Sequence, residues 1–320
     1  MAEAILQSVE LSKSFSARNG IFGKRIENRA VDRVSLSLQK GETLGLVGES
    51  GCGKSTLGLT LLRLYAPDAG QIFFGGKEIT NINERQLKSV RREMQMIFQD
   101  PFAALDWRLT IEQILAEPLE IHNLGTRKER RRIGAELLER VGLSAADLLR
   151  FPAEFSGGQQ QRIGIARALA LRPKLIIADE PVSSLDVSVQ AQILNLLRDL
   201  QDEFGLSYLF ISHNIAVTAF MSSRIGVMYL GRLVEIGTRE QILAAPRHPY
   251  TQALLSAIPE PDPTRRENEI SIKGELSEFS QRPRGCVFRL RCPIADDYCA
   301  AQEPELREVA ENHKAACHFA

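Results

Sequence analysis

The chain has 320 residues, of which 44% are hydrophobic and 25% are charged, which is typical of a globular protein with one large domain and a smaller one. Its 40 Lys and Arg residues balance 40 Asp and Glu residues, so it lacks the basic excess that is typical of nucleic-acid-binding proteins. No apolar run reaches the roughly 20 residues that a membrane-spanning helix needs, and the first ten residues do not resemble a signal peptide. We therefore expect a cytoplasmic protein, with no nucleic acid as a primary partner.

The first part of the chain, to about residue 76, predicts strands. Residues 34–38 alternate polar and apolar side chains, which is typical of a strand with one buried face. After a turn at 40–42, residues 43–47 form a short apolar run of the buried parallel-strand kind. A glycine-rich loop follows, and then an expected helix over residues 56–64.

The glycine-rich loop fits the pattern G-x-x-x-x-G-K-[ST] in the strand–loop–helix context that this pattern requires. Its residues are Gly48, Glu49, Ser50, Gly51, Cys52, Gly53, Lys54, Ser55 and Thr56. The glycines let backbone N–H groups point into one concavity at the positive end of a helix, and such a concavity binds phosphate. In this pattern Lys54 reaches the β- and γ-phosphates and Ser55 supplies a hydroxyl to Mg²⁺. The loop therefore predicts a nucleoside triphosphate site.

The following residues, to about 243, alternate helices and strands. Residues from about 101 to 149 are charge-rich and predict helices, and the basic run at 127–132 indicates a solvated helix face. We expect a further helix over 159–171 and buried strands over 175–178 and 206–211. This alternation predicts a doubly wound parallel sheet. Asp179 and Glu180 follow one of these strands directly, at the sheet edge where α/β proteins bind ligands.

A second phosphate-binding motif begins the expected helix at 159–171. Its residues are Ser156, Gly157, Gly158 and Gln159, preceded by Phe155. A hydroxyl and unobstructed N–H groups at a helix N-terminus favour binding of an anion. Together with the glycine-rich loop, these residues resemble the signature motif and P-loop of the ATP-binding cassette (ABC) ATPases. In that family the signature motif serves an ATP molecule bound to another subunit.

The resemblance implies an α/β fold of the P-loop NTPase class. Its parts would be a RecA-like parallel sheet core, an antiparallel β-subdomain and an α-helical subdomain at about 100–165. The resemblance also assigns roles: Asp179 joins the Mg²⁺ shell and Glu180 polarises the attacking water. Gln99 resembles the Q-loop residue that senses Mg²⁺ and the transmembrane partner.

Three further residues acquire expected roles from the same resemblance. Asp186 resembles the D-loop residue that crosses the dimer interface, and His213 resembles the switch histidine that contacts the γ-phosphate. Phe15 matches the aromatic residue that stacks on adenine, although a core aromatic at a strand end is the alternative. The chain departs from the family at Phe155, where many members have Leu, and at Asn214, where Asp is common. Neither departure removes an expected phosphate contact.

The composition changes near residue 243, where prolines and then cysteines accumulate. We expect an ABC ATPase domain over residues 1–243 and a C-terminal extension over 244–320. Residues 248–255, with Ile258 and Pro259, resemble the extension of ATPase subunits in dipeptide, oligopeptide and nickel importers. The P-loop region resembles most closely the F-type subunit of dipeptide and oligopeptide permeases.

Four cysteines lie in the last 35 residues: Cys286, Cys292, Cys299 and Cys317. In a reducing cytosol such a group predicts a metal site more strongly than a disulfide framework. Their spacing is wider than that of most structural zinc sites, and four thiolates can bind either zinc or a [4Fe–4S] cluster. The resemblance points to the cluster, while zinc and the absence of a metal stay open.

The resemblance as a whole implies an importer ATPase at the cytoplasmic face of the inner membrane. Its partners would be a paralogous ABC ATPase subunit, two transmembrane permeases and, indirectly, an extracytoplasmic substrate-binding protein. A second copy of this chain is the alternative ATPase partner, and nickel is the alternative to dipeptides and oligopeptides. A soluble cassette protein of translation or DNA repair would be expected to carry two cassettes or a coiled-coil insertion. The signature motif excludes a P-loop kinase or GTPase.

Overall fold

The computed structural model describes residues 4–18, 25–100, 104–258 and 282–320. The chain divides into two compact units. The first unit consists of Met1–Ile5, Gln39–Glu42 and Asn81–Phe210, and the second unit consists of Leu6–Leu38, Thr43–Thr80 and Ile211–Ala320.

The first unit is built around three neighbouring strands, with β7 between β8 and β6. They are β6 (Met94–Ile97), β7 (Leu175–Asp179) and β8 (Ser207–Ser212), of which the last two residues of β8 belong to the second unit. β6 and β7 run parallel. Every residue of β7 and β8 is buried, which explains why their sequences are continuously apolar rather than alternating.

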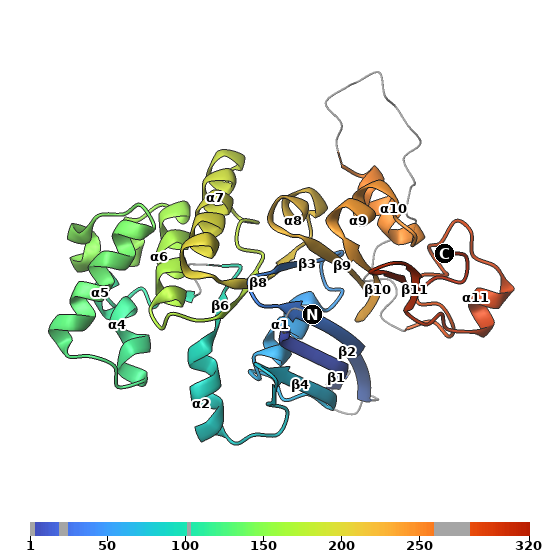
Figure 1. Cartoon of the computed structure of the whole chain (residues 1–320), viewed down its shortest axis with the longest axis horizontal. Coiled ribbons are helices and arrows are strands. Elements are labelled where there is room, and N and C mark those ends of the chain that lie inside the picture. The colour runs from blue at the N-terminus through green and yellow to red at the C-terminus, as the bar shows by residue number, and fades with distance from the viewer. Residues whose placement is uncertain (1–3, 19–24, 101–103, 259–281) are drawn as a thin grey trace. The chain divides into compact units, whose positions relative to one another are not determined.

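Helices make up most of the remaining first unit. They are α2 (Glu84–Glu93), α4 (Ile111–Ile121), α5 (Arg127–Arg140), α6 (Gly157–Leu169) and α7 (Val187–Phe204), with short 3₁₀ turns at Ala145–Leu149 and Pro152–Glu154. α4 and α5 pack side by side (Figure 1). The charge-rich stretch expected to be helical thus becomes α4, α5 and a 3₁₀ turn. α6 begins two residues earlier than the sequence predicts, because Ser156 caps it.

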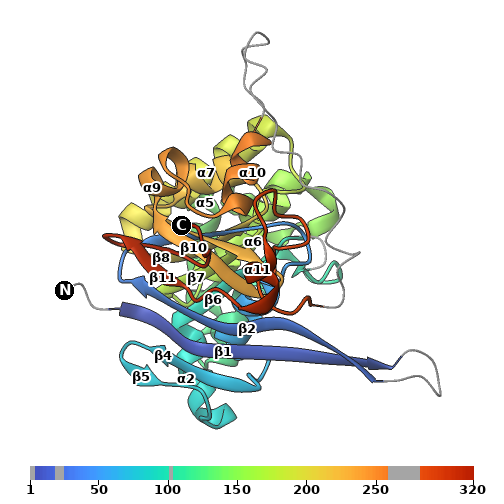
Figure 2. The ribbon, with the colours of Figure 1, turned by 90° about the vertical axis from the view of Figure 1, so that its right-hand side faces the viewer.

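The N-terminal sheet of the second unit has the strand order β2-β1-β4-β5. Its strands are β1 (Ala4–Arg18), β2 (Arg25–Gln39), β4 (Ala69–Phe74) and β5 (Lys77–Glu78). Figure 2 shows β1 and β2 as two long neighbouring strands. Val34, Leu36 and Leu38 are buried whereas Ser35 between them is exposed, so the predicted alternation is confirmed.

The larger sheet of the second unit has the order β11-β12-β10-β9-β3. Its strands are β3 (Thr43–Val47), β9 (Arg224–Tyr229), β10 (Arg232–Thr238), β11 (Arg307–Ala310) and β12 (His313–Ala315). β3 and β9 are parallel, while β10 is antiparallel to both β9 and β12. The last two strands of the chain therefore extend the sheet that contains β3, the strand that precedes the glycine-rich loop.

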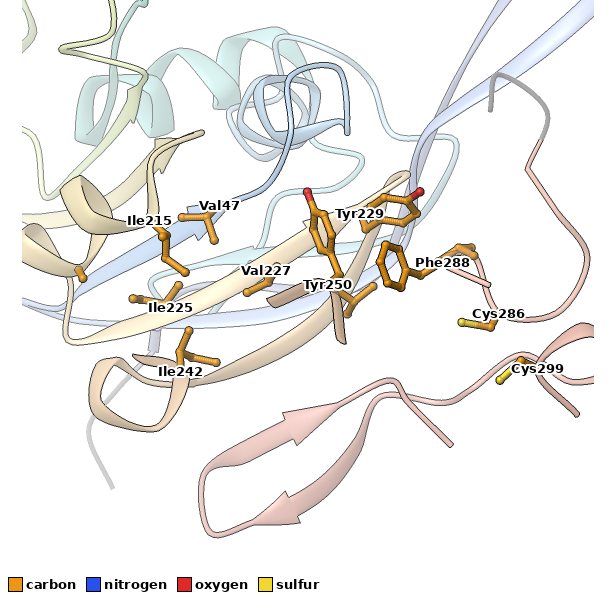
Figure 3. Packing of buried hydrophobic residues seen from close by; sticks show 13 residues of the cluster. Val47, Ile215, Ile225, Val227, Tyr229, Ile242, Tyr250, Cys286, Phe288 and Cys299 are labelled. Atoms are coloured by element: carbon orange, nitrogen blue, oxygen red, sulfur yellow. The ribbon is translucent and has the colours of Figure 1, made fainter. Parts of the chain in front are cut away.

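The helices of the second unit are α1 (Lys54–Leu61), α8 (Ile215–Met221), α9 (Arg239–Ala244), α10 (Pro249–Ser256) and α11 (Asp297–Ala301). One buried apolar cluster joins strand β9, helices α8, α9 and α10 and the cysteine-containing tail (Figure 3). α1 begins at Lys54, two residues before the expected start. Parallel pairing in each unit, an antiparallel N-terminal sheet and a helix-rich segment together confirm the predicted α/β fold class. None of the helices in the described segments combines the length and the apolar character that crossing a bilayer requires.

Candidate functional site

The glycine-rich loop connects β3 to α1 in the second unit, as the sequence predicts. Gly53 has a φ of 106°, in the left-handed region that favours glycine, and a Cβ atom there would lie 2.0 Å from the carbonyl oxygen of Ala30. A Cβ atom on Gly48 would lie 2.2 Å from the carbonyl oxygen of Met228. The backbone is thus packed too closely for any side chain at these two positions, and this close packing gives the loop its shape.

Lys54 lies against this loop. It is 4% exposed, and its Nζ atom donates hydrogen bonds to the carbonyl oxygens of Gly48 at 2.7 Å and Glu49 at 3.0 Å. The sulfur of Cys52 lies 3.8 Å from the same nitrogen. Burial raises the pKa of the Cys52 thiol, although Lys54 acts in the opposite direction, so Cys52 is a neutral packing group and not a reactive thiolate. The loop therefore holds the ammonium group beside the expected phosphate site.

Glu49 contacts two residues from the C-terminal part of the chain. Its backbone N–H donates to the Tyr250 hydroxyl oxygen at 2.8 Å. Its carboxylate forms an ion pair with Arg291, with an Nη1–Oε2 distance of 2.9 Å. No sequence pattern indicates a role for Arg291 at the loop. Tyr250 lies in the stretch that resembles peptide-importer extensions, but neither residue was expected at the loop.

Phe15 and His213 also belong to the second unit. Phe15 is 40% exposed and makes an edge-on contact with Tyr65, with ring centroids 5.3 Å apart. Its exposure disfavours the core-aromatic alternative, but the ammonium of Lys13 lies over the ring at 5.6 Å from the centroid, so the adenine role of Phe15 stays a prediction. His213 is exposed directly after β8. Asn214 caps α8 by accepting hydrogen bonds from the N–H groups of Ala216 and Val217, a task that an Asp side chain performs equally well.

In the first unit, Asp179 ends β7 and Glu180 follows it, beside the expected Q-loop residue. Glu180 Oε2 accepts a hydrogen bond from Gln99 Nε2 at 3.1 Å. This contact follows from the topology, because β6 and β7 are parallel neighbours and their C-terminal ends meet at one edge. Glu180 has a φ of 45°, a left-handed conformation that is costly for a side chain of this kind. Asp179, directly before it, is 5% exposed. Pro101, which completes the expected Q-loop motif, lies outside the described residues.

The signature residues form the capped start of α6. Gln159 N–H donates to Ser156 Oγ at 3.4 Å, and Ser156 N–H donates to Gln159 Oε1 at 2.9 Å, which is a capping box. Ser156, Gly157 and Gln159 are exposed. Phe155 is buried, with the guanidinium of Arg150 over its ring at 4.4 Å. The aromatic residue that replaces the common Leu therefore faces away from the exposed helix start.

Asp186 is exposed and directly precedes α7. It lies in the first unit with Gln99, Asp179, Glu180 and the signature residues, whereas the phosphate loop, Phe15, His213 and the four tail cysteines lie in the second unit. The two units differ in chemical capacity. One unit holds a phosphate-binding loop with its lysine. The other presents a carboxylate suited to activate water and a second anion-binding helix start.

The structure gathers the four tail cysteines, all of which are free thiols. Burial is the main cause that raises the pKa of Cys286 to about 11, and the thiols of Cys299, Cys292 and Cys317 raise it further. The backbone N–H of Cys286 donates to the carbonyl of Cys299 at 2.8 Å. However, no group of three or more His, Cys, Asp or Glu side chains in the described part of the chain is arranged to hold a metal ion. The donor chemistry fits an iron–sulfur cluster, but the sulfur positions as they stand do not support that expectation.

Comparison with known proteins identifies two family regions in this chain. Residues 31–183 match the family described as ABC transporter, and residues 234–299 match the oligopeptide/dipeptide transporter C-terminal region. The second match ends at Cys299 and spans the residues from β10 through Tyr250 and Arg291. Both regions that the sequence resembled are thus recovered independently.

Relatives match over nearly the whole chain. The oligopeptide transport ATP-binding protein AppF of Bacillus subtilis is 53% identical over 324 residues, covering 99% of this chain and 98% of its own. A peptide import ATP-binding protein of Brucella ovis is 50% identical, with the same coverages.

Among solved structures, a dimeric ATP-binding cassette in a post-hydrolysis state with ADP and phosphate is 28% identical, with a TM-score of 0.65. The match covers 73% of this chain and 98% of that cassette. The cbiO1 protein of Clostridium perfringens, part of an ABC transporter complex, gives the same TM-score at 26% identity, covering 76% of this chain and 92% of its own. With these matches, the chain belongs to the ABC transporter family, among the ATP-binding proteins that carry the oligopeptide/dipeptide transporter C-terminal region.

Proposed function

We propose that this chain is the ATP-hydrolysing subunit of an importer for dipeptides and oligopeptides. The observation that carries the proposal is the presence of two different phosphate-binding devices in one chain. The loop before α1 holds Lys54, and the capped start of α6 exposes Ser156, Gly157 and Gln159. The loop can hold the phosphates of one ATP molecule, so the second device is available to an ATP molecule bound by a partner chain. Two devices support a head-to-tail pair of cassettes in which each chain completes the site of the other.

Within such a pair, the residues divide the work as follows. The N–H groups of the loop, apart from that of Glu49, and the Lys54 ammonium would bind the phosphates, and Phe15 would stack on the adenine. Glu180, held by Gln99 at 3.1 Å, would accept a proton from the water that attacks the γ-phosphorus, while the bond to the bridging oxygen of ADP breaks. His213 would contact the γ-phosphate, and Asp186 would lie at the interface.

Ser55, Gln99 and Asp179 would supply oxygen ligands, the kind that a magnesium ion prefers. Bound with ATP, Mg²⁺ would neutralise charge on the phosphates.

The peptide substrate and the partners rest on the relatives. Proteins with the same C-terminal region are named for oligopeptide transport and peptide import. We infer a position at the cytoplasmic face of the inner membrane, a paralogous ATPase partner, two transmembrane permeases that contact the segment near Gln99, and an extracytoplasmic binding protein that supplies the peptide. Substrate choice belongs to the permeases and the binding protein.

Glu180→Gln tests the hydrolytic role directly. The amide keeps an acceptor for Gln99 but cannot take a proton, so turnover should fall by at least about 100-fold while ATP affinity changes little. ATP should then accumulate in a closed dimer, visible by size-exclusion chromatography. The matched control is Glu139→Gln at an exposed position of α5, which should keep wild-type turnover. Unchanged turnover in Glu180→Gln would remove Glu180 from the chemistry.

We also propose that the tail cysteines close around a [4Fe–4S] cluster when iron and sulfide are supplied. The proposal is supported by the four free thiols and by the backbone contact between Cys286 and Cys299, and it requires the four sulfur atoms to move to a common centre. Protein purified without oxygen should be brown, with iron and sulfide lost in Cys292→Ser and kept in Cys52→Ser. A colourless preparation without iron would contradict the cluster proposal. Zinc bound by the same preparation would assign the cysteine site to zinc.

A further inference from the structure

Glu49, in the phosphate loop, is held by a buried arginine of the C-terminal tail, which is the expected extension from residue 244 onward. The Arg291 side chain is 4% exposed. Its Nη1 atom lies 2.9 Å from Glu49 Oε2 and 3.4 Å from the hydroxyl of Tyr229. Burial alone lowers the pKa of Arg291, but the hydrogen bonds to Glu49 and Tyr229 overcome that effect and raise it. Arg291 is therefore a paired cation inside the protein, next to the loop that binds phosphate.

Tyr250 holds the backbone of the same residue. Its ring is fully buried, and its hydroxyl oxygen accepts the Glu49 N–H at 2.8 Å. Tyr250 packs against Tyr229 and Phe288, with ring centroids 4.8 and 5.4 Å away (Figure 3). Because these three rings fix one another, the hydroxyl has a defined position. The N–H of Glu49 is thereby directed toward the C-terminal tail.

Glu49 also connects the tail to the lysine of the loop. Its carbonyl oxygen accepts a hydrogen bond from Lys54 Nζ at 3.0 Å. One residue is therefore fixed at three points, the N–H by Tyr250, the carboxylate by Arg291 and the carbonyl by Lys54. A displacement of Glu49 would change both the loop backbone and the position of the ammonium group.

We propose that Arg291 and Tyr250 are positioning residues for the ATP site, so that the C-terminal tail sets the affinity for ATP through Glu49. Neither residue touches the reacting atoms in this arrangement. They keep the phosphate loop in its binding shape before ATP arrives, which spares ATP the cost of ordering it. The tail thereby acts on nucleotide binding within its own chain, in addition to any role in import.

Arg291→Gln is the first test, with KM and Kd for ATP and kcat measured on the purified full-length chain in complex with its transporter partners. The KM and Kd should rise about tenfold, as expected for loss of a charge-assisted hydrogen bond. The kcat at saturating ATP should stay within about twofold, since Glu180 is untouched. Arg289→Gln is the matched control two residues away. Arg289 Nε donates a hydrogen bond to the carbonyl of Arg284 within the tail, and the KM of this variant for ATP should be that of the wild type.

A double-mutant cycle separates positioning from direct attraction of the phosphates and from a purely structural role. In the Glu49→Gln background, Arg291→Gln should change KM by less than about twofold, because the pair is already broken. If Arg291 attracted the phosphates directly, its effect would persist in that background and the proposal would be overturned. If Arg291 only stabilised the fold, Arg291→Gln would lower the melting temperature and leave KM unchanged, which also overturns it.

Tyr250→Phe keeps the test decisive if Arg291→Gln fails to fold. It removes only the hydroxyl and keeps the packing against Tyr229 and Phe288, so KM for ATP should rise about threefold. An unchanged KM in a folded Tyr250→Phe protein contradicts the proposal. Because the inference rests on the loop being the ATP site, Lys54→Ala is measured in parallel: if it keeps wild-type ATP affinity, the proposed site is wrong, whatever Arg291 does.

Discussion

At the start of α6, two adjacent glycines have very different surroundings. A Cβ atom on Gly158 would lie 2.5 Å from Cγ1 of Val189, whereas one on Gly157 would lie 3.7 Å from Cδ2 of Leu185. The first distance is a clash and the second is an ordinary contact. Both glycines belong to the same exposed motif, so the sequence does not distinguish them.

Gly158→Ala should therefore lower the free energy of unfolding by about 1–3 kcal/mol through overpacking. Gly157→Ala should change it by less than about 1 kcal/mol, since Ala favours the helix and fits the space. Urea unfolding of both variants checks the difference. Gly158→Ala combined with Val189→Ala should recover most of the loss. Equal costs for the two single variants would show that Val189 does not limit the space.

The residues of the nucleotide site differ in how well the sequence predicts them. The strand–loop–helix context of the loop from Gly48 to Thr56 could be predicted from local sequence, whereas its close packing against the carbonyls of Ala30 and Met228 depends on distant segments. The sequence proposes roles for Gln99 and Glu180, but their 3.1 Å contact depends on the pairing of β6 with β7. The left-handed backbone of Glu180 was not predictable, since no glycine or asparagine signals it.

Among the helices, α10 begins with an unusual cap. His248 Nδ1 accepts the backbone N–H of Tyr250 at 3.1 Å, which requires a neutral imidazole. Complete burial lowers the pKa of His248 to about 3. The nearby Glu235 carboxylate accepts the backbone N–H groups of Arg247 and His248 and contacts His313 Nε2 at 2.7 Å. The Glu235 carboxylate thus joins β10 to the start of α10.

This cap predicts a pH dependence of stability. In the unfolded chain His248 takes up a proton below about pH 6.5. In the folded chain it stays neutral down to about pH 3. The unfolded state then binds more protons, so the free energy of unfolding falls as the pH falls, by up to about 2 kcal/mol between pH 6.5 and 5. His248→Asn retains a capping acceptor and does not titrate. The free energy of unfolding of His248→Asn, measured with urea, should fall less than that of the wild type over the same pH range. An equal fall in both proteins would show that His248 is not the titrating group.

At the scale of the molecule, the tail is part of the sheet that carries the phosphate loop. β12 pairs with β10, placing Ala315 opposite Glu235, and β11 pairs with β12. The second unit contains both Thr43–Thr80 and Ile211–Ala320. The domain boundary that we expect near residue 243 remains a prediction. The contacts of Glu49 with Tyr250 and Arg291 link the phosphate loop to residues beyond that boundary.

The sequence by itself determined the family, the ATP chemistry and the candidate residues of each motif. Those features depend on short stretches whose spacing matches local geometry, such as a glycine loop before a helix. Only the tertiary structure decided that Tyr250 and Arg291 hold Glu49, because they lie 201 and 242 residues from it in the chain. It also decided which signature glycine is crowded. Such contacts are set by packing between distant segments, and no local pattern encodes them.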